Sequence, residues 1–145
     1  MKKVCFIGHR DEWRCLGIDK KLEEEIEKVI KRGYFCFYDG NKGAFDNLCL
    51  DVLLRMKIKY PQIKIIRVLV SYTHKKENVP GFLDEVLVAD VEHLHFKQRI
   101  TKRNEWIIDN SDIVICHITN TIRSGAYKAY CYAKKKNKEI VCIGH

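Results

Sequence analysis

The sequence predicts an α/β protein: a single-domain Rossmann-like three-layer sandwich with a mainly parallel sheet. Two observations predict it. Short apolar runs alternate with helical segments along the chain, and the runs are continuously apolar rather than alternating with polar residues. Strands of that kind are buried on both faces, so helices must cover both sides of the sheet. Right-handed crossovers then give three layers.

One domain is expected over residues 1–145, because this length is typical of one domain and the chain holds no repeat, linker or low-complexity tract. In the first half, a four-residue apolar period from Ile18 to Ile30 indicates a helix that Gly33 ends, and Pro61 ends a second helix. The expected elements are strands over 3–8, 34–38 and 63–71 and helices over 19–32 and 43–59.

The second half predicts two more strands and two more helices. Residues 73–82 hold polar residues, Pro and Gly, and are expected to form a loop. Residues 83–98 leave alternatives open: a short strand at 86–88 or at 93–96, or irregular structure. The remaining expected elements are helices over 101–110 and 125–137 and strands over 112–118 and 139–143.

Composition bounds the function. The 27 Lys and Arg residues against 19 Asp and Glu residues give a formal charge of +8, which favours an anionic partner: nucleic acid, a nucleotide or a membrane surface. Plain solubility is the alternative, since many lysines lie at helix ends. No apolar segment approaches the ~20 residues that span a bilayer, and the N-terminal run is too short for a signal peptide, so no membrane partner is expected.

The seven cysteines form no CxxC pair, and most lie in apolar, strand-like runs. This pattern predicts reduced core thiols in a cytoplasmic protein, with no metal site. No cofactor is indicated.

Two loops at the predicted ends of the first strands carry unusual chemistry, and parallel α/β sheets bind ligands at such ends. After the first strand, Gly8 permits close backbone approach, Arg10 offers a fork for phosphate, and His9 is either an anion donor or an acid–base group. The second loop, DGNKGAFD over 39–46, contains Gly40 and Gly43 at a helix start, which suits anions. In its first helical turn, Asp46 either caps the helix or holds a ribose hydroxyl.

Two further segments add to the candidate site. TKRNEW, 101–106, places Arg103 and Asn104 on a helix that leads into a strand. After the next strand, Thr119 lies in a polar loop, and Ser124 and Gly125 open a helix with small residues that let phosphate approach. Each segment alone also fits an ordinary solvated loop or helix face. Their convergence at one sheet edge favours a ligand site.

These motifs resemble the SLOG superfamily, and most of all its YpsA-like branch, which is related to the LOG and Smf/DprA proteins. The resemblance runs from Val4 to Ile143 and is most specific in GNKGAFD, 40–46, and RNEWIIDNSDIVI, 103–115. It implies binding of a nucleotide or nucleotide-derived ligand at the strand ends. The matching positions are Gly8, Arg10, Gly40, Gly43, Asp46, Arg103, Asn104, Ser124 and Gly125.

The sequence departs from LOG-type phosphoribohydrolases at their catalytic glutamate. Ala129 or Tyr130 stands where that carboxylate is expected, and Lys102 stands where these enzymes usually have Glu. Cleavage of a glycosidic bond needs a carboxylate near the anomeric carbon. Asp46 and Glu105 are carboxylates outside the matching position, so the catalytic residues are unknown.

Three functions follow as expectations. The first is a sensor or sequestering module for a nucleotide or nucleotide-derived molecule. The alternative is a nucleotide-processing enzyme of the N-glycosidase or phosphoribohydrolase type, and a lesser alternative is single-stranded nucleic-acid binding. The lesser alternative rests on tyrosines of residues 127–132 near lysines 128 and 134–136, a spacing that an ordinary amphipathic helix shares. SLOG relatives often pair, which makes a homodimer or higher oligomer the expected partner state.

Overall fold

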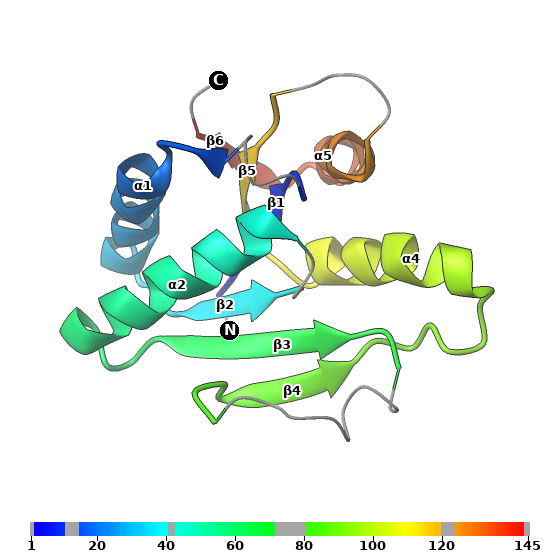
Figure 1. Ribbon diagram of the computed structural model, residues 1–145, viewed down its shortest axis with the longest axis horizontal. Helices are drawn as coiled ribbons and strands as arrows, with labels where there is room; N and C mark the ends of the chain where they lie inside the picture. Colours follow the sequence, from blue (N-terminus) through cyan, green and yellow to red (C-terminus); the bar gives the residue numbers. More distant parts are fainter. Residues whose placement is uncertain (1, 11–14, 41–42, 72–80, 120–123, 144–145) are drawn as a thin grey trace.

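A computed structural model describes residues 2–10, 15–40, 43–71, 81–119 and 124–143. Within them the chain forms six strands and four helices, labelled as in Figure 1. The strands are β1 (Lys3–Gly8), β2 (Cys36–Asp39), β3 (Lys64–Leu69), β4 (Glu85–Val88), β5 (Ile113–His117) and β6 (Glu139–Cys142). The helices are α1 (Asp19–Lys31), α2 (Ala44–Lys59), α4 (Phe96–Asp109) and α5 (Gly125–Lys135).

All six strands are parallel and lie in the order β4-β3-β2-β1-β5-β6. This confirms the predicted α/β class with a parallel sheet. The chain moves outward from β1 in one direction and then returns to build β5 and β6 on the other side. The order therefore reverses between β1 and β5, where Gly8 and His117 are register partners at the carboxyl ends of the strands.

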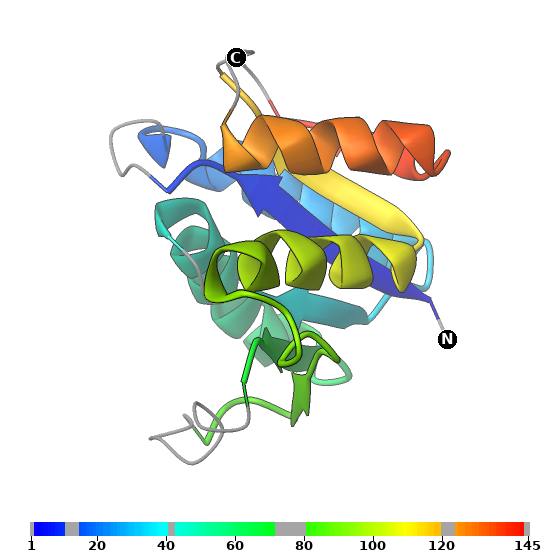
Figure 2. The same cartoon turned by 90° about the vertical axis from the view of Figure 1, so that its right-hand side faces the viewer.

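Two helices cover each face of the sheet (Figures 1 and 2). The apolar residues of α1 and α2 pack with Val4 and Phe37 in one core, and those of α4 and α5 pack with Cys5 and Val114 in the other. Neighbouring residues of β1 thus enter different cores, as the alternation of side chains along a strand requires. This is why the strands are apolar throughout. Figure 2 shows α4 and α5 side by side, with β1 visible between them.

The second strand begins two residues later than predicted. Tyr34 belongs to the end of α1, since its amide donates to the carbonyl of Val29 at 3.1 Å and the Gly33 amide donates to Ile30 at 2.9 Å. Gly33 has a positive φ of 93° there, as the predicted helix-ending role requires. The backbone of Tyr34 therefore closes the helix, and pairing with β3 begins at Phe35, whose carbonyl accepts from the Lys64 amide at 2.8 Å.

Residues 83–98, for which the sequence left alternatives open, contain the short strand β4, which confirms the alternative at 86–88. The alternative strand at 93–96 is wrong, because these residues form a turn that leads into α4 at Phe96. The helix begins five residues before the predicted start. Most of the loop expected over 73–82 lies outside the described residues. Among the described helices, none is long and apolar enough to cross a membrane.

Candidate functional site

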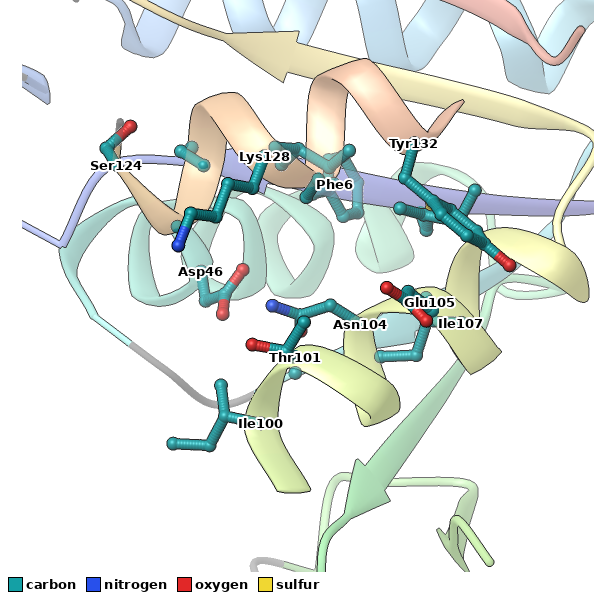
Figure 3. A pocket seen from close by; sticks show the side chains of 18 of the residues that line it. Phe6, Asp46, Ile100, Thr101, Asn104, Glu105, Ile107, Ser124, Lys128 and Tyr132 are labelled. Atoms are coloured by element: carbon teal, nitrogen blue, oxygen red, sulfur yellow. The ribbon is translucent and has the colours of Figure 1, made fainter. Parts of the chain in front are cut away.

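A cavity of about 510 Å³ lies between α4 and α5, over β1 at the point where the strand order reverses. Its volume is in the range of small-molecule sites. The floor and walls combine apolar residues with charged and polar ones (Figure 3). The lining residues that carry polar or charged side chains include His9, Arg10, Asp46, Thr101, Asn104, Glu105, Ser124, Lys128 and Tyr132.

Most of the predicted site residues line this cavity. They are Gly8, His9, Arg10, Gly40, Asp46, Asn104, Ser124 and Gly125. Three predicted residues do not line it: Gly43, Arg103 and Thr119. Each of these three contacts a lining residue or its backbone, and their own contacts show what they do instead.

The start of α5 opens into the cavity. Ser124 is its N-cap, and the Ser124 hydroxyl accepts a hydrogen bond from the Tyr127 amide at 3.0 Å. The next two amides, of Gly125 and Ala126, have no hydrogen-bond acceptor within the described part of the chain, and both residues line the cavity. Unsatisfied amides at the positive end of a helix dipole bind anions. The amides of Gly125 and Ala126 are therefore the candidate donors for the predicted anion site.

The start of α2 is closed by the protein itself. The Ala44 amide donates to the carbonyl of Arg10 at 3.1 Å, and the Phe45 amide donates to the carbonyl of His9 at 3.2 Å. Gly43, with φ of 95°, lies so close that a Cβ would be 2.7 Å from the Cα of Arg10. The glycine thus allows the loop after β1 to cap α2. These two amides are already used, so Gly43 acts in packing rather than in an open anion site.

Gly8 makes room for a side chain of the protein. A Cβ at this position would lie 2.1 Å from the Cγ of Phe45, which is buried against the opposite face of β1. The requirement for glycine at the end of β1 therefore comes from the core beneath α2. Gly8 also lines the cavity, where its backbone forms part of the floor.

Arg103 is a buried clamp between strand ends. Its Nη1 donates to the carbonyls of Gly40 at 2.7 Å and Val68 at 3.2 Å. Burial lowers the pKa of the Arg103 guanidinium, and the carboxylates of Asp46 and Asp39 offset part of this effect. The clamp holds the ends of β2 and β3 against α4.

Gly40 lets two opposite charges approach each other. A Cβ built on Gly40 would lie 3.2 Å from Oδ2 of Asp46 and 3.6 Å from Nη2 of Arg103. Asp39, one residue before Gly40, forms a buried ion pair with Arg67 at 2.8 Å. The carboxylate of Asp46, which lines the cavity, thus lies on the same side of Gly40 as the Arg103 guanidinium, whose pKa it raises.

Four further polar lining residues were not among the predicted site residues: Thr101, Glu105, Lys128 and Tyr132. The sequence offered Glu105 only as a carboxylate outside the family's catalytic position, and Lys128 and Tyr132 only as part of a possible nucleic-acid platform. Figure 3 shows Lys128 extending from α5 on the side of Asp46, while Glu105 and Tyr132 lie at the other end of the cavity. The signal that finds them is helical spacing. Ser124, Lys128 and Tyr132 are four residues apart on α5, and Thr101 and Glu105 are four apart on α4.

Two lining residues have raised pKa values that limit their chemistry. Burial, a hydrogen bond to Asp109 and the charge of Glu105 raise the pKa of Tyr132 to about 12, and its hydroxyl donates to both carboxylate oxygens of Asp109 at 2.8 and 2.9 Å. Tyr132 therefore offers the cavity its ring. Burial raises the pKa of Cys5 to about 12, so its thiol stays protonated at neutral pH and is a poor nucleophile.

The outer tyrosines of α5 contact each other and the lysines of their own helix. Tyr127 and Tyr130 stack with ring centroids 6.2 Å apart, and Nζ of Lys134 lies 5.6 Å from the centre of the Tyr130 ring. Such contacts arise on an ordinary amphipathic helix. They do not by themselves distinguish a nucleic-acid platform from a solvated helix face.

No group of three or more His, Cys, Asp or Glu side chains is arranged to hold a metal ion among the described residues. Searches against protein-family models and against curated proteins found no match to this chain. The resemblance to the SLOG superfamily therefore stays an expectation from the motifs.

Proposed function

We propose that this protein binds a nucleotide or nucleotide-derived small molecule in the cavity between α4 and α5, as a sensor or sequestering module of the SLOG type. The observation that carries the proposal is that complementary polar groups line opposite sides of the cavity, at the point where the strand order reverses. One wall holds the open amides of Gly125 and Ala126 with Lys128, and the other holds Asp46 and Asn104. Open α/β sheets bind ligands at this point of the fold.

The chemistry of the walls suits the parts of a nucleotide. Phosphate oxygens match amides at a helix start and the charge of Lys128 and Arg10. Sugar hydroxyls can donate to the carboxylate of Asp46 and can bond to the side-chain amide of Asn104. The Asn104 side chain makes no hydrogen bond to any described residue. The flat aromatic face of a base suits the apolar floor and the Tyr132 ring.

Isothermal titration calorimetry with AMP, cyclic AMP and ADP-ribose tests this proposal. Lys128→Met removes the cation on the wall, and Lys135→Met is the matched control because it removes the same charge from the same helix outside the cavity. We expect at least one nucleotide to bind, about tenfold more weakly to Lys128→Met, with Lys135→Met unchanged. The absence of heat with all three ligands, or equal weakening by both variants, would contradict the proposal.

Turnover of the ligand is a second candidate function, because two carboxylates, Asp46 and Glu105, line the same cavity. A pair of carboxylates is the usual equipment for cleaving a glycosidic bond. Of the two residues that stand where LOG-type enzymes are expected to have their glutamate, Ala129 lines the cavity and brings only a methyl group, and Tyr130 does not line it. Release of free base from AMP, abolished in both Asp46→Asn and Glu105→Gln, would favour the enzyme; binding without release favours the sensor.

The expectation of a reducing, cytoplasmic setting belongs to the same proposal. It is supported by the cysteines, since all seven are free thiols and none forms a disulfide.

Analytical ultracentrifugation tests the expected homodimer, with a sedimentation coefficient that depends on protein concentration as the predicted result.

A further inference from the structure

The last two strands of the sheet bring two thiols together. Cys116 of β5 and Cys142 of β6 are register partners, and their Sγ atoms are 3.2 Å apart. Neighbouring strands are about 4.8 Å apart, which falls within the range of Cα separations that a disulfide spans. Two cysteines on the same face of adjacent strands therefore need only side-chain rotation to bond. Neither residue belongs to the cavity lining.

The two thiols differ in access. Cys142 is exposed on the edge strand, whereas Cys116 is fully buried. Burial and the neighbouring Cys142 thiol raise the pKa of Cys116 far above its ordinary value. An oxidant arriving from solvent thus meets Cys142 first, with Cys116 directly behind it. This arrangement of an accessible thiol beside a resolving thiol is the one that redox-responsive cysteines use.

The other exposed cysteine provides a comparison inside the same chain. Cys131 lies on α5 and is exposed like Cys142, but no contact with another thiol is found for it within the described residues. Reaction at Cys131 can therefore stop at a single modified sulfur. Of the two exposed cysteines, Cys142 is the one for which the described residues show a second sulfur, that of Cys116, at 3.2 Å.

We propose that Cys116 and Cys142 form a reversible intramolecular disulfide by exchange with a low-molecular-weight disulfide such as oxidised glutathione. In the first step, the Cys142 thiolate attacks one glutathione sulfur, the glutathione S–S bond breaks, and one glutathione thiolate leaves. In the second step, Sγ of Cys116 attacks Sγ of Cys142 and the bond between Cys142 and glutathione breaks. Because Cys116 is buried, its proton passes to the departing glutathione sulfur, which leaves as the second thiol. The protein dithiol is oxidised and the glutathione disulfide is reduced to two thiols.

The new bond would tie the exposed edge strand β6 covalently to β5. The Ile143 amide already donates to the Cys116 carbonyl at 2.8 Å, so the backbone at this point is paired before oxidation. The bond adds a second connection at the same place. Neither cysteine lines the cavity, so this inference does not depend on the proposed ligand.

The test is equilibration of the full chain in glutathione buffers of increasing oxidised fraction, followed by acid quenching, alkylation of the denatured protein and peptide mass spectrometry. We expect a linked Cys116–Cys142 peptide pair, with two fewer alkylated thiols and the loss of two hydrogen atoms. Cys131→Ser keeps the linkage. Cys142→Ser abolishes it, and Cys116→Ala stops at a glutathione adduct on Cys142.

Three results would overturn the proposal. One is a wild-type chain in which Cys116 and Cys142 are both alkylated in buffers that already modify Cys131. Another is a Cys142–glutathione adduct that persists in the wild type without resolution. The third is a linkage whose yield rises with protein concentration, which would mark a bond between molecules. The wild-type peptide map decides the matter even where a variant at buried Cys116 fails to fold.

Discussion

The backbone amide of Thr119 donates a hydrogen bond to Nε2 of His9 at 2.9 Å. His9 follows β1 and Thr119 follows β5, so the bond joins the two loops on either side of the strand-order reversal. Because Nε2 is the acceptor, the ring proton of a neutral His9 is on Nδ1 while this bond exists. The imidazole that the sequence offered as a polar wall or an acid–base group therefore also holds two walls of the cavity together.

This bond gives a first prediction. His9→Phe keeps a buried ring but removes the acceptor, and we expect it to lower the free energy of unfolding by about 1 kcal/mol. His9→Gln retains a side-chain carbonyl that can accept, so its loss should be smaller. Urea denaturation followed by circular dichroism measures both. Equal losses for the two variants would show that the Thr119 bond is not the cause.

Replacing either of two cavity glycines, Gly8 and Gly125, with alanine should change the stability of the fold in opposite directions. In Gly8→Ala the new Cβ would lie 2.1 Å from the Phe45 ring, so the core must shift, at a cost of about 1–3 kcal/mol. In Gly125→Ala the new Cβ meets nothing within 4 Å, and a more restricted unfolded chain should raise stability by about 0.4–1 kcal/mol. Thermal unfolding of both variants checks the pair. A stable Gly8→Ala protein would contradict the packing of Phe45 against β1.

The clamp made by Arg103 predicts a stability effect rather than a direct contact with ligand. Arg103→Met removes the donor from the carbonyls of Gly40 and Val68, and leaving buried acceptors unsatisfied costs about 1–3 kcal/mol. The matched control is Lys102→Met, an exposed neighbour whose loss should change the free energy of unfolding by less than about 0.5 kcal/mol. Similar urea midpoints for both variants would count against the clamp.

Ionisation of the Asp84 carboxyl group should make the stability of the fold depend on pH. Although partial burial favours its neutral form, hydrogen bonds from Lys57 Nζ and the Ile65 amide, both 2.8 Å, lower its pKa below the ordinary 3.8. A lowered folded-state pKa means that the carboxylate stabilises the fold above 3.8, and that this contribution is lost as pH falls through the folded-state value. The urea-midpoint gap between wild type and Asp84→Asn should therefore stay constant from pH 7 to 5 and shrink below pH 4. A gap independent of pH would contradict this.

The sequence predicted the architecture because its signal lies in periodicity. Apolar strand runs and a four-residue helical period placed nine of the ten elements with boundary differences of a few residues, and β4 was one of the alternatives left open over 83–98. The differences arise where tertiary contacts decide. The Tyr34 amide bonds to the end of α1 instead of starting the second strand. The helix α4 begins at Phe96, whereas the sequence predicted a start at residue 101.

The candidate site was predictable only in part, since sequence shows which loops follow strands but not what their glycines face. Gly8 and Gly43 look like space for a ligand, yet they admit Phe45 and the backbone of Arg10. In contrast, Gly125 faces open space at the start of α5. Lys128 stood out in the sequence only as part of a basic helix that contains tyrosines, because its place at the cavity depends on how α5 packs beside α4.

The most direct test of the binding site uses the two helix starts as an internal comparison. The amides of Gly125 and Ala126 are open to the cavity, whereas those of Ala44 and Phe45 are bonded to carbonyls of Arg10 and His9. The measurement is a two-dimensional ¹H–¹⁵N NMR titration of the full chain with the nucleotide that gives most heat among AMP, cyclic AMP and ADP-ribose. The account predicts large saturable shifts at Gly125 and Ala126 and smaller ones at Ala44 and Phe45. Shifts that favour Ala44 and Phe45, or that lie outside the cavity lining, would contradict it.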